Sequence, residues 1–128
     1  MDKESQDKCN QDLLLAAENR QWGSAKRLIS LGADINTSLQ SEIFSGCTVV
    51  WLAAYCSKWD FVREYYNTCN MDIHPNVGFL GGITIAWLAA IEHEWTLLSK
   101  IYLNINLDTY PNNKPGYTVI YIAADHYK

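Results

Sequence analysis

Three reactive side chains recur at nearly the same interval along the chain. Cys56, Glu92 and His126 lie 36 and 34 residues apart. Together they offer a thiol nucleophile, an acid and a base, the groups of a nucleophilic mechanism. If they occupy one position in successive helical units, helix axes roughly 8–10 Å apart keep them beyond the hydrogen-bond distance of about 3 Å. Cys56 paired with His93, from a neighbouring position, stays open as an alternative.

Other catalytic and metal-binding motifs are absent from the sequence. It has no glycine-rich phosphate loop, no nucleophile elbow and no His-Glu-x-x-His segment. The four cysteines include no Cys-x-x-Cys pair, so neither a zinc site nor a redox motif is indicated. The sequence therefore predicts a protein that is not an enzyme and needs neither metal nor cofactor.

Composition restricts the class of partner. A formal net charge of −4 argues against nucleic acid and against an anionic membrane surface. No apolar run approaches the length of a membrane span, and no segment has the order of a signal peptide. We expect a cytoplasmic protein, in the host cytosol if it is a microbial or viral product, that binds another protein.

The elements that carry these side chains are repeated, as the tryptophans show. One series consists of Trp22, Trp59 and Trp95, and a second consists of Trp51 and Trp87 and continues in Tyr121. Within each series the interval is 34–37 residues. Because so large a residue rarely recurs in this way by chance, the chain is predicted to be an array of similar units.

Each unit is predicted to contain two helices. Gly46, Gly82 and Gly116 are each followed two residues later by threonine, a good N-cap, and then by an apolar stretch that ends in Ala-Ala. A tryptophan of the first series precedes the second helix, whose i, i+1, i+4, i+5 spacing predicts one buried face. That face contains Ala25, Leu28, Ile29, Phe61, Val62, Tyr65, Tyr66, Leu97, Leu98, Ile101 and Tyr102.

Helix ends are also marked in the sequence. Gly32 suits the left-handed residue that terminates a helix. Aligning the later units by Asp72 and Asp108 places Asn70 and Asn106 at the position of Gly32, and asparagine is the next most tolerant residue there. This alignment requires one extra residue at the end of each later helix, which we expect as a wide turn.

Taken together, this pattern resembles the ankyrin repeat, whose unit reads Gly-x-Thr-Pro-Leu-His-x-Ala-Ala, then Gly-His, a second helix and Gly-Ala-Asp-Val-Asn. The segment 16–36 matches that frame without a gap. The proline of the family is Val49, Ile85 or Val119 here, and its Gly-His turn is replaced by Arg20-Gln21, Ser57-Lys58 and His93-Glu94. Its histidine is replaced by Trp51, Trp87 and Tyr121, which we expect to be structural, with indole N–H groups that need partners.

The resemblance implies an all-α ankyrin-repeat solenoid, built from stacked helix-turn-helix units with finger loops. We expect one domain over residues 1–128, with a leading unit 12–36, units 46–73 and 82–109, and a C-terminal half unit 116–128. The loops between units carry apolar residues that either pack on the next finger or meet a partner. These residues are Leu39, Ile43, Phe44, Pro75, Val77, Phe79, Leu80, Tyr110, Pro111 and Pro115.

The resemblance also implies a binding surface, formed by the concave face and the finger loops. Carried over by position, its partner-binding residues are Trp22, Phe44, Cys47, Tyr55, Cys56, Trp59, Leu80, Ile83, Ile91, Glu92, Trp95 and Tyr117. A surface rich in tryptophan and tyrosine has the composition of an interaction hot spot. For Trp22, Trp59 and Trp95, packing inside the protein is an equally good explanation.

The sequence thus predicts a non-catalytic module for protein–protein interaction. One alternative is a self-associating scaffold segment, which would form a homo-oligomer through the C-terminal half unit, where we expect an uncapped end to expose Ile120, Tyr121 and Ile122. Another is an N-terminal fragment of a longer ankyrin protein whose activity lies elsewhere.

Overall fold

The protein is all-α, as predicted. The computed structural model describes residues 1–76, 78 and 80–126, and this part of the chain contains helices and connecting segments but no strand. Val77 and Phe79 of the second predicted finger, and the last two residues of the half unit, lie outside the described residues. The chain divides into two compact units, Met1–Cys69 and Asn70–Lys128, which are described separately below.

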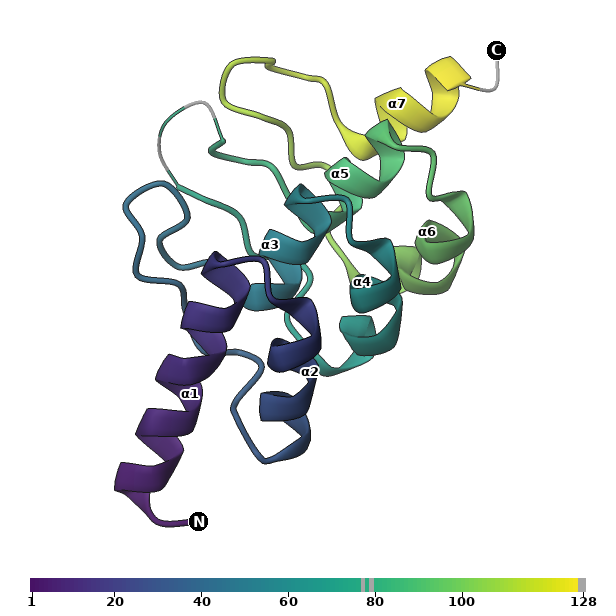
Figure 1. Ribbon diagram of the computed structural model, residues 1–128. Helices are drawn as coiled ribbons and strands as arrows, with labels where there is room; N and C mark the ends of the chain where they lie inside the picture. Colours follow the sequence, from purple (N-terminus) through teal and green to yellow (C-terminus); the bar gives the residue numbers. More distant parts are fainter. Residues whose placement is uncertain (77, 79, 127–128) are drawn as a thin grey trace. The chain divides into compact units, whose positions relative to one another are not determined.

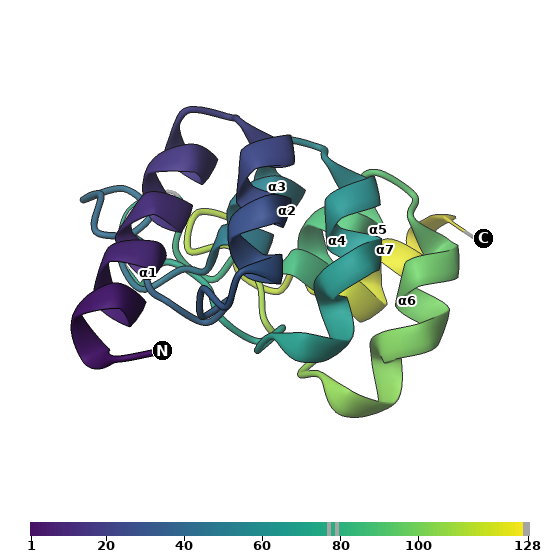
Figure 2. The same ribbon diagram turned by 60° about the horizontal axis from the view of Figure 1, so that its bottom comes forward.

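Two helical layers form the first unit. Its elements are α1 (Lys3–Glu18), α2 (Trp22–Ser30), α3 (Val49–Tyr55), α4 (Trp59–Tyr65) and the 3₁₀ turn η1 (Tyr66–Thr68). Helix α1 packs against α2 and α3, and α3 packs against α4 (Figure 1). Helices α2 and α4 lie side by side (Figure 2). They are joined by the rings of Trp22 and Phe61, with centroids 5.1 Å apart, and by the ion pair of Lys26 and Glu64 at 2.9 Å.

The second unit repeats this plan with fewer helices. It contains α5 (Ile85–Ile91), α6 (Trp95–Ile101), the 3₁₀ turn η2 (Tyr102–Asn104) and α7 (Val119–His126). Helix α5 packs against both α6 and α7. No second helix follows α7 among the described residues.

Threonine caps begin the first helix of three successive repeats, as predicted. The Thr48 hydroxyl accepts a hydrogen bond from the Trp51 amide at 3.3 Å, and the Thr84 hydroxyl accepts one from Trp87 at 3.1 Å. The Thr118 hydroxyl accepts one from Tyr121 at 3.1 Å. Each bond satisfies an amide that has no partner within its own helix. The tryptophans of the first series stand at the first residue of α2, α4 and α6.

Helices α1, α3 and α5 end in the same six-residue motif. Arg20, Ser57 and His93 adopt φ of 61°, 62° and 62°, the left-handed conformation that glycine adopts most readily. The amide that follows each of them donates to the carbonyl of the first alanine of the Ala-Ala pair at 2.8 Å, as in Lys58 to Ala53. This is the Schellman arrangement. The turn therefore forms here without glycine at the left-handed position.

The ends of the second helices correct one prediction. Gly32 is left-handed, with φ 110°, but Asn70 and Asn106 are not. The Asn70 and Asn106 side chains instead accept the Asp72 and Asp108 amides at 3.0 and 2.9 Å, the turn that Asp34 makes with the Asn36 amide.

Asn70 and Asn106 thus occupy the position of Asp34, and the alignment by aspartates was wrong. Trp22 precedes Asp34 by 12 residues, whereas Trp59 precedes Asn70 by 11, as Trp95 precedes Asn106. The later helices are therefore one residue shorter, not longer. The turns η1 and η2 explain this, because a 3₁₀ turn rises about 2.0 Å per residue against 1.5 Å in an α-helix.

The three residues predicted to be structural differ in how far they are buried. Trp51 is fully buried and Trp87 is 7% exposed, as expected of core residues. Tyr121 is 54% exposed and lies at the surface, because in the described residues no further helix covers that side of α7. Tyr102 was expected on a buried face but is 50% exposed, since it belongs to η2 and not to the regular turns of α6.

Candidate interaction surfaces

An aromatic cluster closes one end of the first unit. The Tyr55 ring stacks on the Trp51 ring, with centroids 5.3 Å apart and planes 13° apart. Phe44, from the finger loop, contacts Trp51 at 5.7 Å and Tyr55 at 5.5 Å. Tyr55 remains 39% exposed and Phe44 is half-buried. Trp51 thus acts as a rigid base that holds two aromatic side chains at the surface.

A second aromatic cluster has the equivalent position in the second unit. The Tyr117 ring contacts Trp87 at 6.2 Å and Tyr121 at 5.3 Å. The Lys114 ammonium lies 5.3 Å from the centre of the Tyr117 ring, within cation–π range. Trp87 donates from its indole Nε1 to the Tyr117 carbonyl at 2.8 Å. The expectation that this indole N–H needs a partner is thus confirmed for Trp87.

Both units keep a large side chain exposed directly after the Ala-Ala pair. Tyr55 is 39% exposed and Ile91 is 38% exposed. Each is the last residue of its helix, and the left-handed residue two positions later turns the chain away. The side chains that follow them are the half-buried Cys56 and the exposed Glu92.

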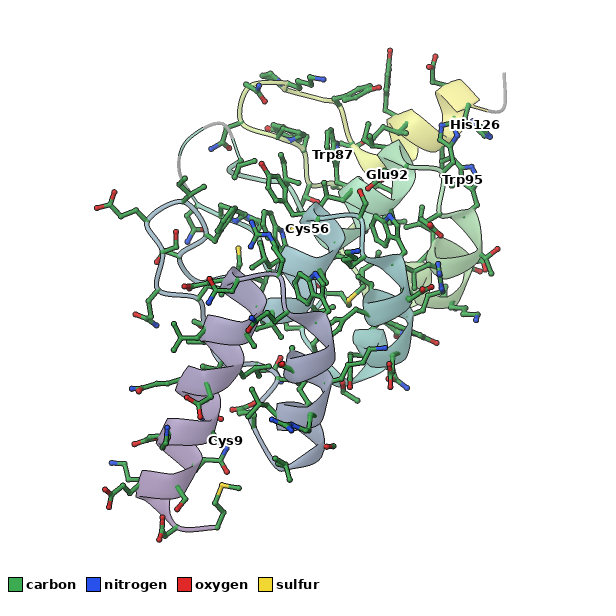
Figure 3. The ribbon with its side chains drawn as sticks, in the orientation of Figure 1. Cys9, Cys56, Trp87, Glu92, Trp95 and His126 are labelled. Carbon is green, nitrogen blue, oxygen red and sulfur yellow. The ribbon has the colours of Figure 1, made fainter. Side chains whose placement is uncertain are left out.

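Trp95 lies in an aromatic group with two histidines in the second unit. Its ring stacks on His93, with centroids 5.8 Å apart, and contacts His126 at 4.9 Å (Figure 3). The two histidine rings are 4.6 Å apart. Of the three residues first considered for catalysis, Glu92 and His126 belong to this unit and Cys56 belongs to the first.

The other two tryptophans of this series are packed against their own unit. Trp22 is half-buried against Phe61, and Trp59 is 7% exposed. The indole Nε1 of each is buried and has no hydrogen-bond partner in the described part of the chain. Leaving such a donor unpaired costs about 1–3 kcal/mol. For Trp59, packing inside the protein is therefore the better explanation.

Three further residues expected at the binding surface are buried. Cys47 is fully buried, because its carbonyl accepts the Leu39 amide at 2.7 Å and closes the base of the finger. Leu80 and Ile83 are 5% and 8% exposed. They lie on either side of Gly81-Gly82. The Gly81 carbonyl accepts a hydrogen bond from the Asn112 amide of the last finger at 2.7 Å, so the two fingers of the second unit pack together.

Burial also determines the chemistry of two thiols. It raises the pKa of Cys47 to about 12 and that of Cys69 to about 11, so both stay protonated at neutral pH. No disulfide joins the four cysteines. Figure 3 places Cys9 on α1, well away from Cys56 at the end of α3. Within the described ranges, no three His, Cys, Asp or Glu side chains are grouped so that they could hold a metal ion.

The second unit also exposes apolar residues on α7. Ile120 is 52% exposed and Tyr121 is 54% exposed, as expected of an uncapped end, whereas Ile122, expected to be exposed with them, is only 6% exposed. Sequence reasoning missed Leu103, which is 79% exposed. Leu103 belongs to η2, beyond the regular turns of α6.

No protein-family model matches the chain, and no curated protein matches it in sequence. Across the residues that the structure describes, none of the helices combines the length and the apolar character needed to cross a membrane.

Proposed function

We propose that this chain is an ankyrin-type array that binds another protein without catalysing a reaction. Three features of the described repeats support the ankyrin assignment. Threonine caps α3, α5 and α7, the Ala-Ala pairs of α1, α3 and α5 are followed by the same left-handed turn, and α2, α4 and α6 each begin at tryptophan. The loop between helices α6 and α7 extends away from them, as a finger does (Figure 1).

One observation carries the binding function. Tyr55 and Ile91 occupy the same position in two repeats, and each is large, mostly apolar and more than a third exposed. Full burial of a side chain of this size would stabilise the folded protein by about 1.5–3 kcal/mol, so exposure is unfavourable for a residue that serves stability alone. Their repeated exposure beside a buried tryptophan favours a surface that a partner covers.

Each unit then has its own binding surface, which combines this position with its neighbours. In the first unit the surface comprises Tyr55, Cys56 and the finger residue Phe44, over the Trp51 base. In the second unit it comprises Ile91, Glu92, Trp95 and Tyr117. We assign the anchoring role to Tyr55 and Phe44, because they are aromatic, already ordered by ring contacts and partly exposed.

We place the protein in the cytoplasm, or in a host cytosol if it is a microbial or viral product. A reducing compartment suits four cysteines that form no disulfide. The net charge of −4 supports a protein partner over nucleic acid.

Affinity capture from cytosolic extract tests the proposal. We expect the wild-type chain to retain one or a few specific proteins, identified by mass spectrometry. A Tyr55→Arg, Ile91→Arg double variant should lose them, because two charges would be buried in the interface. Leu103→Arg is the matched control, since Leu103 is 79% exposed but lies outside the proposed surface. Equal recovery by all three proteins would refute the proposal.

A further inference from the structure

An open apolar groove runs between α6 and α7 in the second unit. Its volume is about 500 Å³, and its lining consists of Trp95, Leu98, Ser99, Tyr102, Leu107, Val119, Ile120, Ala123 and Ala124. The Ser99 hydroxyl already donates to the Thr96 carbonyl at 2.6 Å. Tyr102 and Ile120 are each about half exposed. The groove therefore presents a contiguous apolar surface to water.

The first unit contains an equivalent groove, which α4 occupies. Counting from the repeated tryptophan and threonine, the equivalents of Trp95, Leu98, Ser99 and Tyr102 are Trp22, Ala25, Lys26 and Ile29 on α2. The equivalents of the α7 residues are Val49, Val50, Ala53 and Ala54 on α3. Helix α4 packs on α3 and contacts α2 through Phe61 and Glu64. An interface of this kind is thus already established within the chain.

Residues that line the groove of the second unit are more exposed than their equivalents in the first unit. Val50 is fully buried, whereas its equivalent Ile120 is 52% exposed. Ala54 is fully buried, whereas its equivalent Ala124 is exposed. The corresponding residues of α5, on which α6 packs, are also buried. This face of the first helix is therefore buried in the two repeats that have a second helix packed on it, α4 on α3 and α6 on α5.

We propose that the groove between α6 and α7 binds one amphipathic helix of a partner protein, in the place that α4 takes in the first unit. This inference rests on the proposed protein-binding function and names a second surface for it. Such recognition uses a few apolar anchors on one helix face. The pattern of α4 sets them at i, i+1 and i+4, as in Phe61, Val62 and Tyr65.

The charge of the partner helix follows from the same comparison. In the first unit Glu64 pairs with Lys26 at 2.9 Å, but Ser99 stands at the position of Lys26 in the second groove. Glu64 is exposed, so a carboxylate at its position on the partner helix would stay in water and lose only a weak ion pair. The partner helix therefore gains nothing from an acidic residue at the position of Glu64.

The probe is a labelled peptide with the sequence of residues 58–68 and Glu64→Gln, added to the full 128-residue chain. A hydrocarbon staple that replaces the exposed Arg63 and Asn67 holds it helical, since an isolated helix this short is marginal in water. Binding is measured by fluorescence anisotropy. We expect saturable binding, and the unmodified Glu64 peptide should bind within about fivefold of the Glu64→Gln peptide, because an exposed ion pair contributes about 0–1 kcal/mol.

Two neighbouring residues provide the matched variants. Ile120 and Tyr121 lie on the same helix and are 52% and 54% exposed, but only Ile120 lines the groove. Ile120→Glu should weaken binding at least about tenfold, whereas Tyr121→Glu should leave it within about twofold. Because both sites are exposed, both variants should fold, which circular dichroism checks.

Binding should also be visible at one tryptophan. Trp95 lines the groove and Trp51 is fully buried in the first unit. In a ¹H–¹⁵N spectrum, we expect the peptide to shift the Trp95 indole signal and leave the Trp51 signal in place. Absence of saturable binding, or binding that Ile120→Glu leaves unchanged, would overturn the proposal.

Two further outcomes separate the alternatives. If the mass in solution rises with concentration and Ile120→Glu abolishes the rise, the occupant is a second copy of this chain and the assigned partner is wrong. If the peptide binds as expected while Tyr55→Arg, Ile91→Arg captures the same proteins as wild type, the groove stands and the first proposed surface fails.

Discussion

The indole of Trp87 donates a hydrogen bond to the main-chain carbonyl of Tyr117, 30 residues later, at 2.8 Å. This bond links α5 to the segment that leads into α7, within one unit. Under the proposed ankyrin assignment, a histidine would stand at this position. Here a larger ring fills the core and still supplies the donor.

Trp87→Phe should therefore destabilise the protein more than Trp59→Phe does. Both tryptophans are 7% exposed and lose the same atoms, but only Trp87→Phe leaves a carbonyl without its donor. The Trp59 indole N–H has no partner among the described residues. We expect a difference of about 1–2 kcal/mol in the free energy of unfolding, measured by urea denaturation. Equal losses would show that the Trp87 bond is energetically neutral.

Replacing Gly82 by alanine should destabilise the protein more than the same change at Gly46. Both are repeat glycines with positive φ, 84° and 86°. A Cβ at Gly82 would lie 1.9 Å from the Tyr110 carbonyl oxygen, whereas one at Gly46 would meet nothing within 4 Å. Gly46→Ala should cost about 1 kcal/mol through backbone strain, and Gly82→Ala a further 1–3 kcal/mol or so, because the fingers must separate. Thermal unfolding of the two variants measures the difference, and similar melting temperatures would contradict it.

Ser57→Gly should stabilise the protein by about 0.5–1 kcal/mol. Ser57 has φ 62°, a conformation that costs a residue with a Cβ more than it costs glycine. Lys58→Gly is the control, since Lys58 has an ordinary φ of −88° and glycine there should destabilise the chain. The urea midpoints of both variants, compared with wild type, decide this prediction. A loss of stability in Ser57→Gly would mean that the turn carries little strain.

Stability should fall as the pH rises above about 9, in part through Cys47. Burial raises the pKa of this thiol from 9.0 to about 12, so the folded state keeps a proton that the unfolded chain releases. The contribution is complete below pH 9 and is lost as pH rises towards 12. Between pH 8 and pH 10 it amounts to about 1 kcal/mol. Urea denaturation at both pH values should give a smaller loss for Cys47→Ala, and parallel losses would refute the assignment.

Local features of the fold could be predicted from the sequence because neighbouring residues determine them. Thr48, Thr84 and Thr118 cap helices through bonds that span three residues, and Gly32 ends a helix through its own φ preference. The burial of Trp51 and Trp87 followed from their place beside the alanine pairs. The helical class and the starts of the second helices were accessible for the same reason.

Tertiary structure alone decided how the segments are covered and how they end. The sequence could not show that a 3₁₀ turn replaces the last α-helical turn before Asn70 and Asn106, since the two differ by one residue in length. Nor could it show that Leu80 is buried while Leu103 is 79% exposed, although both are leucines. Burial depends on which segments pack on a residue from far along the chain, and periodicity within one helix carries no information about them.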